Sequence, residues 1–94
     1  MKLKILELAS FEIEDAKQYY NLQQDKLGDR FKKDVQKSID NIVLSPKLYP
    51  QVENSMRRCL LHRFPYSIFY DIDNDTVVVL SVAHQRRKPY YWVD

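Results

Sequence analysis

The chemistry-bearing residues of this chain gather near its C-terminal end, in the stretch HQRRKPYYW at positions 84–92. Histidine is the side chain that titrates nearest to neutral pH, so His84 is a candidate general acid or base. Arg86 and Arg87 follow it, and a planar guanidinium group suits phosphate, carboxylate or aromatic partners. The tyrosines and tryptophan after them can stack on nucleic-acid bases or anchor the segment on a sheet. The stretch therefore predicts either a functional surface or a terminal anchor.

Arginine is distributed unevenly along the chain. Five of the six arginines lie after position 56, whereas eight of the nine lysines lie at or before Lys47, interleaved with acids. Lysines mixed with acids are typical of a solvated helix surface, whereas arginines concentrated in one half indicate contacts with a partner. The net charge of +2 is too small to predict nucleic-acid binding by itself. We therefore expect the contact surface in the second half of the chain.

Length and composition exclude several classes of protein. A chain of 94 residues is expected to form one domain, spanning residues 1–94. Cys59 is the only cysteine, which excludes an internal disulfide and a cysteine-based metal site, and two isolated histidines predict no metal site either. The N-terminus has no signal-peptide core and no apolar run is long enough to span a membrane. We expect a cytoplasmic protein without a cofactor.

The first half of the sequence predicts a strand followed by two helices. Residues 1–8 are typical of a strand, and Ser10 is predicted to cap a helix that runs toward Leu27. The single glycine, Gly28, is predicted at the C-terminal turn of that helix. Apolar residues then repeat at helical spacing from Phe31 to Val43, and the prolines of SPKLYP end the second helix. Two helices joined by a short turn form a helical hairpin.

The second half changes to the two-residue period of strands. MRRCLLHRF and YSIFYDI are predicted strands, and DND reverses the chain into TVVVLSVAH, which is apolar on both faces as expected for an interior strand. The order is β-α-α-β-β-β. We therefore predict an α+β fold: a small twisted, mostly antiparallel sheet with an N-terminal strand and a two-helix hairpin packed on one face.

The order of these motifs resembles a known family. A helical hairpin, then SPKLYP, RRCLLHRFPYSIFYDI and VVVLSVAHQRRKPYYW, is similar to the RelE/ParE superfamily of type II toxin–antitoxin toxins over essentially the whole chain. The resemblance implies a toxin that inhibits growth and a cognate antitoxin that wraps and neutralises it in a hetero-oligomeric complex. It also implies one of two targets. ParE-like members poison DNA gyrase, whereas RelE-like members cleave mRNA on the ribosome.

The two targets need different residues. Metal-independent RNA cleavage needs a base, an acid and cations at the phosphate. For a RelE-like ribonuclease, the resemblance assigns catalysis to His84 and Tyr91. For either target, it places Arg58, Arg86 and Arg87 at the contact surface.

Three positions depart from the ribonuclease pattern. Ser67 stands where RelE-like enzymes carry an arginine in the strand after the proline, and Leu60 replaces a second basic residue. Gln85 aligns with their C-terminal arginine, although Arg86 is adjacent. Losing a positioned cation typically lowers the rate by about a hundredfold or more. We therefore favour a ParE-like binder of DNA gyrase, with the ribosome-dependent mRNA endonuclease as the alternative.

Overall fold

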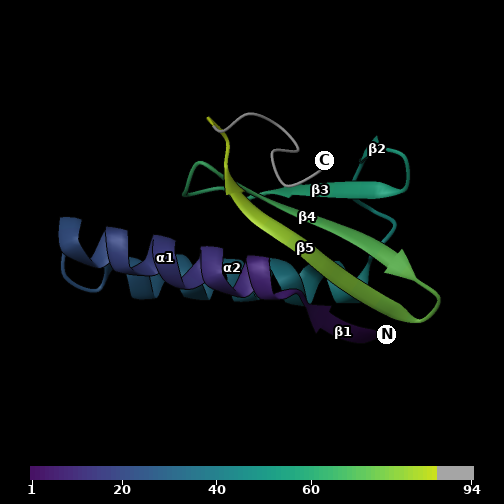
Figure 1. The fold of residues 1–94 in the computed structure, drawn as a ribbon, viewed down its shortest axis with the longest axis horizontal. Coiled ribbons are helices and arrows are strands. Elements are labelled where there is room, and N and C mark those ends of the chain that lie inside the picture. Colours follow the sequence, from purple (N-terminus) through teal and green to yellow (C-terminus); the bar gives the residue numbers. More distant parts are fainter. Residues whose placement is uncertain (87–94) are drawn as a thin grey trace.

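The computed structural model describes residues 1–86, which form two helices on one face of a five-stranded sheet (Figure 1). The long helices lie side by side beneath the strands, and the sheet twists across them. The elements in chain order are β1 (Lys2–Ile5), α1 (Glu7–Gln23), α2 (Leu27–Leu44), β2 (Gln51–Glu53), β3 (Met56–Leu60), β4 (Tyr66–Asp73) and β5 (Thr76–His84).

The sheet confirms the predicted fold class. Its strands lie in the order β1-β5-β4-β3-β2; β1 runs parallel to β5 and every other pair is antiparallel. The tight reversal between β4 and β5 places Asn74 at φ 55°, a left-handed conformation that asparagine tolerates. The short strand β2 was not predicted, because three residues are too few to show an alternating pattern. No helix within residues 1–86 is long and apolar enough to cross a membrane.

The main core lies between the helices and the sheet. The predicted stripe of α2 is buried, and its side chains pack on apolar residues of β3, β4 and β5. The largest fully buried side chains of this core include Phe31, Ile39, Ile68 and Tyr70. Cys59 belongs to the same core at 4% exposure. A second, smaller cluster of Met56, Phe69 and Ala83 lies on the face of the sheet away from the helices.

Two predictions about the helices are wrong. The helix α1 begins at Glu7 rather than after Ser10, and Leu6 at its start makes no side-chain cap. Gly28 lies in the first turn of α2, not at the end of α1; the turn instead uses Lys26 at φ 64°. The physical reason is that α1 passes close to the start of α2, so that glycine is required for space and not for a left-handed turn.

The strand β3 is shorter than predicted. MRRCL forms it, and it ends at Leu60, whereas residues 61–65 connect it to β4. His62 was predicted to lie on the strand, but it is exposed in this connection. Pro65 interrupts the alternating pattern and provides no N–H for a ladder, which explains why one continuous run of strand residues divides here.

The Tyr70 hydroxyl anchors the sheet to the loop after α2. It donates a 2.5 Å hydrogen bond to the carbonyl of Pro46, and the side chain is fully buried. Burial raises the pKa of Tyr70 to about 12. The pKa of Tyr70 in the folded state lies above the unfolded value of about 10. The protonated Tyr70 hydroxyl therefore contributes stability that is fully present below pH 10 and is lost as the pH rises toward 12.

We expect Tyr70→Phe to lower the free energy of unfolding by about 1 kcal/mol, since the Pro46 carbonyl loses its donor. The difference between the two proteins should be largest below pH 10 and should shrink between pH 10 and 12. Urea denaturation across this pH range measures it. Equal alkaline loss of stability in the wild type and in Tyr70→Phe would contradict the assignment.

Candidate functional site

The strand β3 presents its two adjacent arginines to opposite faces of the sheet. Arg57 lies on the helix face, where its guanidinium donates to the carbonyls of Lys47 and Tyr49 at 3.2 and 2.6 Å. Arg58 is exposed and pairs across the sheet with Phe69, on the face away from the helices. None of the ion pairs within residues 1–86 uses Arg58. Arg57 is therefore a structural residue, and the Arg58 guanidinium is available to a partner.

Two of the three positions that depart from the ribonuclease pattern, Leu60 and Ser67, lie next to one another beside Arg58. Leu60 and Ser67 are register partners on β3 and β4. They share the face of Arg58, because side chains two apart on a strand lie on the same face. Leu60 is 51% exposed, whereas Ser67 is 4% exposed. This part of the sheet therefore presents one cation, Arg58, beside an exposed leucine and a buried hydroxyl.

His84 lies at the end of β5, where the sequence places it, but on the helix face. Its ring centroid is 5.1 Å from that of Tyr66 in an edge-to-face contact. Leu8 and Phe11 of α1 lie on the same side, where they line a small pocket together with His84. The Nδ1 atom of His84 accepts a 3.0 Å hydrogen bond from the backbone N–H of Arg86. His84 and Arg58 are therefore on opposite faces of the sheet.

The chain turns immediately after β5. The backbone N–H of Gln85 donates to the Pro65 carbonyl at 2.8 Å, which fixes this turn to the β3–β4 connection. Arg86 is exposed in the turn. Arg87 and Tyr91, the other two candidate site residues, lie outside the residues that the structure describes. Their roles stay predictions, as do those of Arg58, Arg86 and His84.

A buried carboxylate that the sequence did not indicate as a site residue shapes the end of β5. Glu12 Oε1 accepts hydrogen bonds from the Ser81 hydroxyl at 2.7 Å and from the Val82 backbone N–H at 3.0 Å. The register shifts here, so that Leu80 and Ser81 both face Phe69 of β4. The sequence signal that could have indicated Glu12 is an acid on the same side of α1 as the buried residues Ala9, Ile13 and Ala16. Glu12 therefore holds the strand that leads to His84 and Arg86.

Beyond these groups, the described residues offer neither a metal site nor a reactive thiol. Within residues 1–86, no three His, Cys, Asp or Glu side chains gather where they could hold a metal ion. Burial raises the pKa of the Cys59 thiol, which keeps it protonated at neutral pH. A protonated, buried thiol is a poor nucleophile, so Cys59 is a core residue.

The sequence of this chain matches a family of toxins. Residues 3–89 match the family described as "ParE toxin of type II toxin-antitoxin system, parDE". The match spans most of the chain. This protein therefore belongs to the ParE toxin family, and it is a RelE/ParE-type toxin of a type II toxin–antitoxin system.

Solved structures support the same fold. A chain of the chromosomal ParDE system from P. aeruginosa is 17% identical and superposes with a TM-score of 0.68, covering 89% of this chain and 95% of that chain. A chain of the intact E. coli RelBE toxin–antitoxin complex is 20% identical with a TM-score of 0.70, covering 92% and 98%. The isolated E. coli RelE toxin is 20% identical with a TM-score of 0.68, covering 97% and 90%. No curated protein matches the sequence.

Proposed function

We propose that this toxin inhibits growth by binding DNA gyrase, and that a cognate antitoxin neutralises it in a hetero-oligomeric complex. The observation that carries the choice of target is the placement of Arg58 and His84 on opposite faces of the sheet. A ribonuclease needs an acid or base and a cation at the same phosphate. A binding surface needs no such convergence.

The surroundings of Arg58 support binding over cleavage. Leu60 and Ser67 supply no charge beside it, and exposed Leu60 adds apolar area to the same face. A guanidinium beside an exposed aliphatic side chain is a common composition for a protein contact. Arg86 is exposed in the turn after β5 and extends the contact surface, and Arg87 and Tyr91 are proposed as further contacts.

The direct experiment is inducible expression of the chain alone, with growth, DNA damage and mRNA cleavage scored together. We expect growth arrest with a DNA-damage response and, with purified gyrase, accumulation of cleaved DNA complexes. Intact mRNA in translating ribosomes is expected. Cleaved mRNA without gyrase-dependent DNA damage would replace the proposal with the ribosome-dependent endonuclease, and normal growth would reject both.

Substitution of Arg58 tests the surface itself. We expect Arg58→Glu to lower the yield of gyrase-dependent cleaved DNA by more than tenfold, because it reverses the charge at the contact. Lys4→Glu makes the same charge change at an exposed position on β1 and should leave the yield unchanged. His84→Gln should retain gyrase poisoning, whereas the endonuclease alternative requires this substitution to abolish mRNA cleavage.

The antitoxin is tested genetically. We expect a small reading frame beside this gene whose co-expression restores growth, and co-purification of its product with the toxin. Growth arrest that persists when every neighbouring small reading frame is co-expressed would contradict this part of the proposal.

A further inference from the structure

One side of α1 carries a continuous row of exposed apolar side chains, which we call the α1 stripe. Its members are Leu8, Phe11, Tyr19 and Leu22. They recur every three or four residues, which places them on one side of the helix over roughly 20 Å. Phe11 is 65% exposed and Leu22 is 87% exposed. Single exposed apolar residues are common on proteins, but a contiguous row of them indicates an interaction surface.

The α1 stripe lies on the side of the hairpin away from α2. Lys17 of α1 forms an ion pair with Asp29 of α2. Asn21, one helical turn further along, accepts the 2.7 Å hydrogen bond from the Gly28 N–H. These two residues mark the side of α1 that faces α2, and the stripe lies about half a turn around the helix from them. The stripe is therefore covered by no element within residues 1–86.

Asp15 lies at the centre of the α1 stripe and lines a small pocket of about 80 Å³. The pocket lies between α1 and the ends of β4 and β5, and part of its lining is aromatic: Phe11, Tyr66 and His84. Glu12 also lines it, but its Oε1 atom is already bonded to β5. Asp15 is exposed and makes no ion pair within residues 1–86. Its carboxylate is therefore the group that can bind a ligand here.

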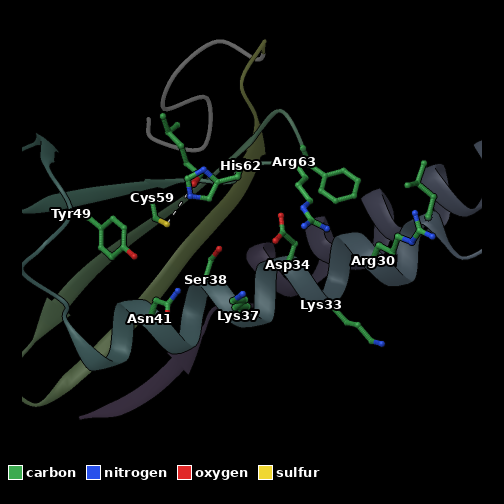
Figure 2. Close-up of a pocket in the computed structure, with 13 residues that line it drawn as sticks. Arg30, Lys33, Asp34, Lys37, Ser38, Asn41, Tyr49, Cys59, His62 and Arg63 are labelled. Atoms are coloured by element: carbon green, nitrogen blue, oxygen red, sulfur yellow. Dashed lines mark hydrogen bonds between the residues drawn. The ribbon is translucent and has the colours of Figure 1, made fainter.

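The two sides of the helical hairpin differ in charge. Figure 2 shows the groove between α2 and the end of β3, the α2 groove, whose labelled cations are Arg30, Lys33, Lys37 and Arg63. The pocket beside α1 is lined by two carboxylates and, within residues 1–86, by no lysine or arginine. The whole chain has a net charge of +2, so this pocket is a local concentration of negative charge. It favours a cationic ligand and repels the phosphates of a nucleic acid.

The size and lining of the pocket select among cations. Its volume is that of about two or three water molecules, so a guanidinium or ammonium group fits and a nucleotide does not. A guanidinium group stacks on aromatic rings and donates two parallel hydrogen bonds to a carboxylate. Phe11 and Tyr66 supply the rings, and Asp15 supplies the carboxylate. The pocket therefore fits the head group of an arginine side chain.

The spacing of the α1 stripe distinguishes a partner protein from a second copy of this chain. The stripe is symmetrical about Asp15: Leu8 and Leu22 lie seven residues to either side of it, and Phe11 and Tyr19 lie four residues to either side. Two copies packed symmetrically through α1 would bring the two Asp15 carboxylates together. Like charges at the centre of an apolar interface are destabilising. A helix of a different protein can place a cation there instead.

We propose that the α1 stripe and the adjoining pocket are a docking surface for an amphipathic helix of a protein partner, whose central arginine enters the pocket. Apolar side chains of that helix, three and four residues apart, pack against the stripe. The guanidinium group donates to Asp15 and lies against Phe11 and Tyr66. Arg58 is on the far face of the sheet, and the α2 groove is on the other side of the hairpin. Docking at α1 therefore leaves the proposed gyrase surface free.

The probe is a set of helical peptides of about 18 residues, long enough to span the stripe, which differ at one central position only. Each carries leucines at three- and four-residue spacing, and the central residue is arginine, citrulline, leucine or glutamate. We expect the arginine peptide to bind the purified chain more than tenfold tighter than the citrulline peptide, since citrulline has the shape of arginine without its charge. In Asp15→Asn this difference should fall to within about twofold, and Asp15→Lys should prefer the glutamate peptide.

Matched variants separate the surface from general effects of charge and hydrophobicity. Asp73→Lys makes the same charge change as Asp15→Lys at the other end of β4 and should retain the preference for arginine. Phe11→Ala should weaken the arginine peptide by about tenfold. Leu44→Ala removes an exposed apolar side chain from α2 and should leave the affinity unchanged. All these side chains are exposed, and circular dichroism checks that each variant folds.

The two histidines of the chain report where the peptide lies. His84 lines the pocket beside α1, whereas His62 lines the α2 groove. The imidazole NMR signals of His84 should shift when the arginine peptide is added, and those of His62 should not.

Three outcomes would overturn the proposal. Equal affinity of the arginine and citrulline peptides, or binding of neither, would show that the pocket recognises no guanidinium group. Shifts confined to His62 would place the peptide in the α2 groove. A dimer of the purified chain that Phe11→Ala dissociates would assign the stripe to a second copy. Binding is measured with purified protein and does not require toxicity, so this inference and the proposed gyrase activity can fail independently.

Discussion

Gly28→Ala is expected to lower the free energy of unfolding by about 3 kcal/mol, the upper end of the usual range for overpacking. A Cβ atom at this position would lie 2.0 Å from the backbone carbonyl oxygen of Lys17 and 2.8 Å from the Asn21 side chain. The first contact is with backbone, so the two helices must separate to relieve it. Alanine is favoured over glycine in a helix by only about 1 kcal/mol, which is too little to compensate.

Thermal or urea denaturation of the purified chain measures this effect. For a domain of this size a loss of about 3 kcal/mol corresponds to a fall in Tm on the order of 15 °C. Asn21→Ala is the matched control: it removes only the 2.7 Å hydrogen bond that the Gly28 N–H donates to Asn21 Oδ1, worth about 1 kcal/mol. The double variant should remain at least as unstable as Gly28→Ala. Recovery of stability in the double variant would show that the side chain, and not the carbonyl, limits the approach of the helices.

Glu12→Ala is expected to have the second large effect, also about 3 kcal/mol, because it leaves two buried donors without their acceptor. The Ser81 hydroxyl and the Val82 N–H both bond to this carboxylate, and Ser81 is fully buried. The cause lies in the short N-terminal strand. β1 covers β5 only from Thr76 to Val79, so Glu12 supplies an acceptor where the sheet has no further strand on that side within residues 1–86.

A graded series of substitutions separates the contribution of the hydrogen-bond acceptor at Glu12 from the contribution of its charge. Glu12→Gln keeps one acceptor oxygen and should lose about 1 kcal/mol, between the wild type and Glu12→Ala. Glu14→Gln changes an exposed acid of the same helix, whose partner is Lys32, and should leave stability nearly unchanged. Urea denaturation of the wild type and the three variants measures the order of their free energies of unfolding. Equal stability of Glu12→Gln and Glu12→Ala would show that the hydrogen bonds to Ser81 and Val82 contribute nothing.

The secondary structure could be predicted where one residue period dominates. The apolar spacing from Phe31 to Val43 defined α2, and alternation with an apolar run defined β4 and β5. Local patterns of this kind follow from helix and strand geometry, which is independent of the rest of the chain. The ends of elements were predicted less well. The start of α1 at Glu7 and the end of β3 at Leu60 depend on where the chain must leave the core.

The candidate site depended more strongly on tertiary structure. Val77 and Val79 of β5 face the helices. If the side chains of β5 alternated strictly from there, His84 would lie on the same face of the sheet as Arg58. The bulge at Leu80 and Ser81 reverses the alternation. Ala83 therefore joins Met56 and Phe69, while His84 turns to the helix side against Tyr66. No single-strand pattern reveals such a bulge, since it is held by a carboxylate 69 residues away in sequence.

The sequence by itself determined the family resemblance, the order of the elements, the buried stripe of α2 and the concentration of arginines in the second half, because these depend on residue types and short spacings. Only the tertiary structure decided why the single glycine is needed, what Glu12 binds, and on which face of the sheet Arg58 and His84 lie. Each of those depends on two segments distant in sequence meeting at a fixed separation. That meeting follows from the packing of the whole core and not from any local pattern.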